Sequence, residues 1–124
     1  MFGSPEKRVE TRPYDHGIEY FLFIQKKGGP LQVGYIRLFT NPTLESTDVI
    51  SWFEIEAKHR GKGYGDYLLG YALSQSKTKY QRLSVGGDNQ YARRLYKKHG
   101  FVEVSRTEGK NGEEDIIILQ RTAP

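Results

Sequence analysis

Hydrophobic and polar positions alternate through much of the first half of the chain, with the period of two that is typical of β-strands. Apolar and aromatic runs bounded by glycine-rich or charged stretches predict strands over residues 19–25, 31–39 and 48–56. The segment KKGGP, residues 26–30, predicts the turn between the first two strands. The polar arm before them, around residues 8–12, is a candidate for an additional edge strand.

Strict alternation gives the strand over residues 48–56 two distinct faces. One face carries Val49, Ser51, Phe53 and Ile55, and the other carries Ile50, Trp52, Glu54 and Glu56. We therefore expect the two carboxylates to face solvent and to point away from the face that holds Ser51 and Phe53. The alternative is a β-bulge that re-aims one of them.

Apolar residues in the second half recur with the helical period of 3.6 in two segments. The apolar stripe of the first helix, which ends near Ser76, is Tyr64, Leu68, Leu69, Ala72 and Leu73. The second helix begins after Asp88 or Asn89, either of which is a suitable N-cap, and Gly100 ends it. Its apolar side is Ala92, Leu95, Tyr96 and His99.

Short strands predicted over residues 82–86, 101–106 and 115–120 complete the pattern. With the edge strand, the order is β-β-β-β-α-β-α-β-β. The fold class is therefore α/β, with a mixed, mostly antiparallel sheet flanked by two main helices. We expect residues 1–124 to form a single domain, in which residues 1–12 are a polar arm or edge strand.

The amino-acid composition limits the kinds of functional site that the chain can form. The chain has no cysteine, which excludes a disulfide scaffold, a thiolate nucleophile and a Cys-ligated zinc site. Its three histidines lack metal-ligand spacing, so we expect no metal. No signal peptide or membrane-spanning run is visible, which favours a soluble, cytoplasmic protein that does not bind a membrane. The net charge of +4 suits a polyanionic ligand, such as a phosphorylated cofactor, as easily as nucleic acid.

The segment HRGKGYG, residues 59–65, places three alternating glycines where a helix begins. The first N–H groups of a helix are unpaired and attract anions, and glycine lets a phosphate approach the backbone closely. The dinucleotide-binding fingerprint does not fit, because Asp66 stands where its third glycine should be, and no P-loop pattern is present.

Two blocks resemble the GCN5-related N-acetyltransferase (GNAT) superfamily. The pattern Arg60-x-x-Gly63-x-Gly65 resembles that family's acetyl-CoA-binding motif. The segment NQYARRLYKKHGF, residues 89–101, is similar to its following motif, and the matching positions are Asn89, Ala92, Tyr96, Gly100 and Phe101. The resemblance covers roughly residues 31–120, in the family's order of strands and helices.

The resemblance implies an acetyl-CoA site. Backbone N–H groups of residues 61–65 would hold the pyrophosphate, Arg60 and Lys62 would add charge, and the pantetheine arm would pair with the backbone of Phe53 and Ile55. The cofactor-binding residues implied in this way are Phe53, Ile55, Arg60, Gly61, Lys62, Gly63, Tyr64, Gly65, Asn89 and Tyr96.

It also implies that an amine attacks the thioester directly, without a protein nucleophile, and that Tyr96 reprotonates the departing CoA thiolate. The chain departs from the family at the general base, because Val49, Ser51 and Ser84 stand where members commonly place Glu, His or Tyr. We expect water bound by Ser51 or Ser84 to carry the proton away.

Family members usually have two helices between their first two strands, whereas only PYDHG, residues 13–17, is available here. The open acceptor site that results favours a protein lysine or N-terminus over a small-molecule amine. The alternative to an open site is a cover supplied by residues 40–47 or by the second copy in a homodimer. The alternative to an enzyme is a non-catalytic acyl-CoA-binding module. A nucleic-acid-binding module is disfavoured, because the basic residues 93, 94, 97 and 98 have the pattern of a solvated helix face.

Overall fold

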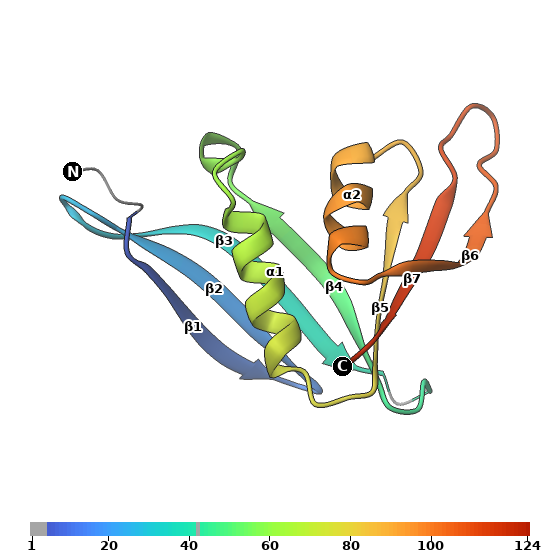
Figure 1. Ribbon diagram of the computed structural model, residues 1–124, viewed down its shortest axis with the longest axis horizontal. Helices are drawn as coiled ribbons and strands as arrows, with labels where there is room; N and C mark the ends of the chain where they lie inside the picture. Colours follow the sequence, from blue (N-terminus) through green and yellow to red (C-terminus); the bar gives the residue numbers. More distant parts are fainter. Residues whose placement is uncertain (1–4, 42) are drawn as a thin grey trace. The chain divides into compact units, whose positions relative to one another are not determined.

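Seven strands and two α-helices form the fold in the computed structural model of the chain, which describes residues 5–41 and 43–124 (Figure 1). The elements are β1 (Lys7–Tyr14), β2 (Gly17–Lys26), β3 (Gly29–Thr40), β4 (Thr47–Ile55), a 3-10 helix (Ala57–His59), α1 (Tyr64–Gln75), β5 (Tyr80–Gly86), α2 (Gln90–Lys98), β6 (Val102–Thr107) and β7 (Ile116–Thr122). Residues 1–4 of the predicted arm and residue 42 of the predicted 40–47 loop lie outside the described residues.

The strand order in the sheet is β1-β2-β3-β4-β5-β7-β6. The pairs β1–β2, β2–β3, β5–β7 and β6–β7 are antiparallel, and β4–β5 is parallel. The predicted mixed, mostly antiparallel α/β fold with two main helices is confirmed. The sequence pattern did not predict the 3-10 helix, because a single turn is too short to show a period.

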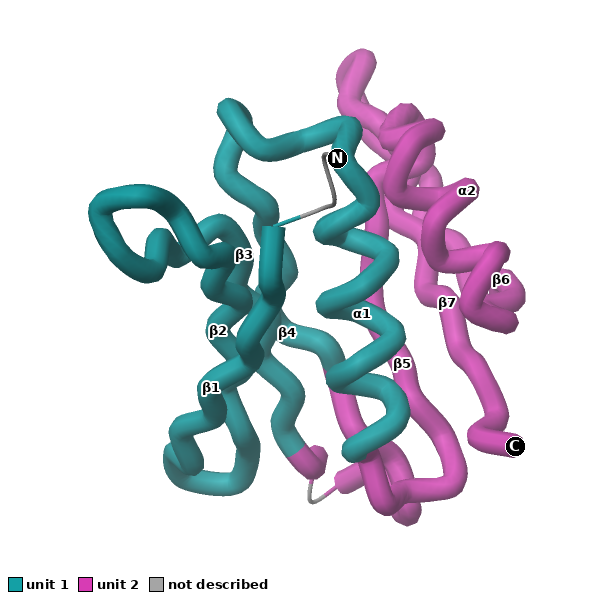
Figure 2. The backbone as a smooth tube through the Cα atoms, turned by 60° about the vertical axis from the view of Figure 1, so that its left-hand side comes forward, with its two compact units in different colours: residues 1–39, 50–75 teal, residues 40–49, 76–124 magenta. Residues whose placement is uncertain are grey.

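The chain divides into two compact units (Figure 2). Unit 1 consists of residues 1–39 and 50–75, and unit 2 consists of residues 40–49 and 76–124. Strand β4 contributes its first residues to unit 2 and the rest to unit 1.

In unit 1, strands β1 and β2 form a hairpin with a very short connection. Tyr14 pairs with Gly17, so only Asp15 and His16 lie between the strands, and Asp15 adopts a left-handed φ of 31°. Aspartate tolerates this conformation better than most residues because its side chain can bond to the local backbone. No helix is inserted between these two strands, as the sequence predicted.

Helix α1 covers one face of the unit 1 strands and forms its core with them (Figure 1). The predicted helical stripe is buried throughout, and strands β2 and β3 contribute the fully buried side chains of Leu22, Ile24, Val33 and Ile36. The contact is close at Gly34: a Cβ there would lie 2.6 Å from Ile55 Cδ1 and 3.1 Å from Leu68 Cδ2, so these side-chain ends would have to shift.

The opposite face of unit 1 carries a polar network centred on Glu19. Tyr35 donates a hydrogen bond to Glu19 Oε2, and Arg12 Nε donates to Oε1 at 2.9 Å. The hydrogen bond from Tyr35 is the largest cause of a lowered pKa of Glu19, with desolvation opposing it and Arg12 adding to it. Glu19 is thus an ionised carboxylate with both oxygens engaged, which makes it a poor proton acceptor.

In unit 2, the first residues of β4 pair in parallel with β5, from Thr47 opposite Tyr80 to Val49 opposite Arg82. Strand β5 pairs with β7 along its whole length, and β6 is the outer strand. Helix α2 contributes one buried side chain, Tyr96, whose ring lies 5.7 Å from that of Phe101 in an edge-to-face arrangement.

Candidate functional site

The turn that leads into α1 contains two glycines with a left-handed backbone. Gly61 has a φ of 77° and Gly63 a φ of 85°, a region that strains L-residues. A Cβ built on either glycine would meet no atom within 4 Å. Gly65 differs from both, because it is buried in the first turn of α1 and its φ is not positive. The alternating glycines therefore serve two purposes: two shape the turn and keep its outside open, and the third packs inward.

The start of α1 presents donors beside this turn. Tyr67 N–H bonds to Gly63 O at 3.1 Å, which is the first bond of the helical ladder. The N–H groups of Tyr64 and Gly65 precede that bond and have no partner within the helix. The partial positive charge of the helix end adds to them. Open space beside the glycines, unpaired donors and the helix dipole together fit a phosphate group, so these residues suit the pyrophosphate of a CoA cofactor.

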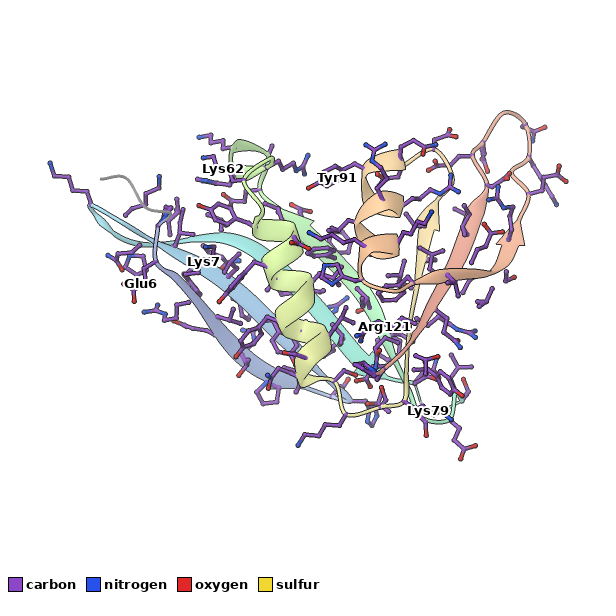
Figure 3. All side chains as sticks on the ribbon, viewed as in Figure 1. Glu6, Lys7, Lys62, Lys79, Tyr91 and Arg121 are labelled. Atoms are coloured by element: carbon purple, nitrogen blue, oxygen red, sulfur yellow. The ribbon has the colours of Figure 1, made fainter. Side chains whose placement is uncertain are left out.

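The side chains around the turn have different surroundings. Arg60 is exposed, and its Nε donates to Ile55 O at 2.9 Å. Tyr64 is buried, so only its backbone is available to a ligand. Lys62 is exposed and makes none of the hydrogen bonds or ion pairs found among the described residues (Figure 3). The sequence did not indicate that His59 is buried, with an Nδ1 atom that has no hydrogen-bond partner among the described residues.

Strand β4 does not keep the strict alternation that the sequence suggested. Ser51 Oγ accepts a hydrogen bond from Arg37 Nε at 3.0 Å, on the face opposite α1. Ile55 instead lies beside Leu68 of α1. Residues four apart share a face in a regular strand, so the pleat must slip by one residue between them. The prediction that Val49, Ser51, Phe53 and Ile55 share one face is therefore wrong. Glu54 and Glu56 are nevertheless both exposed, as the sequence predicted.

Unit 2 carries the remaining predicted site residues. Ser84 is exposed on β5, and its hydroxyl makes no hydrogen bond among the described residues. Asn89 is the N-cap of α2, since its Oδ1 accepts from Ala92 N–H at 3.1 Å. Asp88 was the alternative cap, and the structure selects Asn89. The amide NH₂ group of Asn89 remains a donor.

Tyr96 is 8% exposed, and burial raises its pKa to about 12. A phenol with this pKa stays protonated at neutral pH, so it can donate a proton but cannot act as a base. Burial therefore keeps the proton on Tyr96 at neutral pH and makes the phenol a weaker acid than an ordinary tyrosine.

A carboxylate that the sequence analysis missed holds the turn before α2. Glu114 Oε2 accepts from Asp88 N–H at 2.9 Å, and a Cβ on Gly86 would overlap the Glu114 carboxylate. The pair Gly86-Gly87 was the available sequence signal, because adjacent glycines often mark a close approach of another group. Nothing in the spacing identified that group as a residue 28 positions further along the chain.

Comparison with known proteins decides the family. A model of the acetyltransferase (GNAT) family matches residues 2–101. The chain belongs to this family. Comparison with curated protein sequences gives no match.

Solved structures of GNAT enzymes share the fold. The ribosomal-protein-S18-alanine N-acetyltransferase from Escherichia coli has a TM-score of 0.75 at 17% identity, over 90% of this chain and 72% of that one. The NatC complex bound to Gag peptide and CoA gives 0.74 at 21%, over 86% and 71%. Mutant forms of the spermidine/spermine N-acetyltransferase SpeG from Vibrio cholerae give 0.72 at 20%, over 88% and 68%.

The protein is thus an acetyl-CoA-dependent N-acetyltransferase of the GNAT family, as the sequence predicted. The similar structures include enzymes for a ribosomal protein and for polyamines, so the fold alone does not select a protein acceptor. Among the described residues, no helix has both the length and the apolar character needed to cross a membrane.

Proposed function

We propose that this GNAT enzyme acetylates a primary amine of a protein, either a lysine side chain or an N-terminus. The observation that carries the proposal is the β1–β2 connection, which consists of Asp15 and His16 alone. The helix pair that the family usually inserts there is absent, and a small amine needs more enclosure than a protein segment does.

Cofactor binding begins at the turn before α1. We assign the pyrophosphate to the backbone N–H groups of residues 61–65, with Lys62 and Arg60 as the nearby positive charges. The backbone of Phe53 and Ile55 would pair with the pantetheine arm. Asn89, whose amide NH₂ group is still a donor, remains a predicted cofactor-binding residue. The bound cofactor supplies the activated acetyl thioester.

Tyr96 and the two serines would handle the protons. Tyr96, protonated at neutral pH, is assigned as the acid that protonates the departing thiolate. Ser51 already accepts from Arg37 Nε, and its hydroxyl lies 3.4 Å from Arg37 O. Ser84 has its hydroxyl uncommitted among the described residues, which makes it the better of the two to hold the water that removes the amine proton.

The test incubates the protein with labelled acetyl-CoA and three acceptors, with mass spectrometry as the readout. The acceptors are a peptide with one lysine and a blocked N-terminus, a lysine-free peptide with a free N-terminus, and spermidine. Gly63→Asp is the control for cofactor-dependent labelling. Acetylation of either peptide supports the proposal. Acetylation of spermidine alone contradicts it, and CoA binding without any transfer would favour the non-catalytic module.

A further inference from the structure

We propose that Arg60 is a positioning residue, which holds the glycine turn through the backbone of β4 and whose charge contributes little to cofactor binding. This inference rests on the proposed use of the turn as the pyrophosphate site. It departs from the simpler expectation that Arg60 and Lys62 act alike as positive charges. The two side chains differ in what they contact.

The peptide group between Ile55 and Glu56 is held at both of its polar ends. Its carbonyl oxygen, Ile55 O, accepts from Arg60 Nε at 2.9 Å. Its N–H group, on Glu56, donates to Val33 O of β3 at 2.9 Å. The Arg60 side chain thus reaches back to the last residue of β4, and that residue is itself anchored to the neighbouring strand.

The backbone from Glu56 to Arg60 is held by one short and one long hydrogen bond. His59 N–H donates to Glu56 O at 2.8 Å, but the bond from Arg60 N–H to Ala57 O is long, at 3.4 Å. The chain then enters the left-handed conformation of Gly61, which offers no side chain to restrain it. The Arg60 guanidinium therefore supplies the side-chain contact that fixes where the glycine turn starts.

Guanidinium chemistry suits this role. The Nε–H lies within the planar group, so a bond from it sets the orientation of the whole side chain. A lysine keeps the charge but carries its donors on a flexible stem, and it has no equivalent of Nε–H. Lys62, two residues further on, is exposed and lacks any such contact among the described residues (Figure 3). Arg60→Lys therefore removes the contact and keeps the charge, whereas Lys62→Gln removes a charge and keeps the contact.

The experiment measures CoA affinity by calorimetry at low and high salt for the wild type, Arg60→Lys, Arg60→Gln and Lys62→Gln. We expect both Arg60 variants to lose affinity by about tenfold, the scale of one hydrogen bond from a charged group, with the salt dependence unchanged. Lys62→Gln should lose less, and its deficit should shrink at high salt because screening weakens exposed charges. Wild-type affinity in Arg60→Lys, with a loss only in Arg60→Gln, would overturn the proposal.

A second readout needs no cofactor. Amide hydrogen exchange at Glu56 and His59 in the unliganded protein, corrected for intrinsic rates, should rise by about tenfold in both Arg60 variants and stay unchanged in Lys62→Gln. Unchanged exchange in the Arg60 variants would overturn the positioning role. A wild type that fails to bind CoA would instead refute the proposed pyrophosphate site, and the exchange rates would still decide what Arg60 does.

Discussion

The two α-helices of this protein differ in how much of each helix is buried. This difference distinguishes a helix that stabilises the core from one that carries a candidate catalytic residue. Helix α1 buries six of its twelve residues, five of them on the apolar stripe against the strands of unit 1. Helix α2 buries only Tyr96 among its nine residues. Contacts at its N-terminal end secure it, namely the Asn89 cap and the bond from Arg93 to Gly87 O at 2.9 Å.

This contrast shows that a helical pattern in the sequence does not measure how much of a helix is buried. The hydrophobic stripe of α1 makes it part of the core. The other members of the predicted apolar side of α2, Ala92, Leu95 and His99, are only partly buried, and most of its charged residues are exposed. We expect substitutions in α1 to act on folding and those in α2 to act on local geometry and chemistry.

The largest expected effect is on turnover and comes from α2. Tyr96→Phe should slow acetyl transfer by up to about 10²–10⁴-fold, the usual worth of a positioned acid, while CoA affinity and the free energy of unfolding change little. Steady-state kinetics and calorimetry would measure this. Tyr91→Phe is the matched control, since Tyr91 lies on the same helix and is 61% exposed (Figure 3). A near-normal rate for Tyr96→Phe would leave Tyr96 as a core aromatic only.

The largest effect on folding should come from α1. Leu68→Ala removes a fully buried side chain, which should lower the free energy of unfolding by about 2–5 kcal/mol in denaturant titrations. Arg94→Ala, at an exposed position of α2, should stay within about 0.5 kcal/mol of the wild type. Equal losses in the two variants would remove the contrast between the helices.

A smaller effect distinguishes the two roles assigned to Asn89. Asn89→Ala removes the cap and should cost about 1 kcal/mol in thermal or chemical unfolding. Asn89→Asp keeps an accepting oxygen and should restore that stability. Because aspartate lacks the NH₂ donor, it should still bind CoA more weakly than the wild type. Full recovery of both stability and affinity would make Asn89 a cap alone.

Local patterns sufficed for the fold because each strand and helix shows its own period and is bounded by its own turn residues. The absence of helices between β1 and β2 followed from the few residues available between them. The family could also be recognised from two motifs, because the glycines shape the turn in which they lie and Asn89 caps the helix that follows it directly.

Contacts between distant segments could not be predicted in the same way. The slip in β4 is set by where Arg37 and Leu68 lie, and alternation within one strand contains no information about either. The bond from Arg60 to Ile55 O and that from Asp88 N–H to Glu114 depend on how the chain folds back. The sequence could identify these residues as charged, but it could not show what they contact.

The central claim is that the turn before α1 holds the cofactor, and a matched pair of glycine variants tests it most directly. Gly63 and Gly112 have φ values of 85° and 83°, and a Cβ on either would meet no atom within 4 Å. Aspartate therefore strains both positions alike. The measurement is the rise in melting temperature that acetyl-CoA produces, which corresponds to about 2.7 kcal/mol at one hundred times the dissociation constant. We expect Gly112→Asp to keep this rise and Gly63→Asp to lose it; an equal rise in both folded variants would contradict the account.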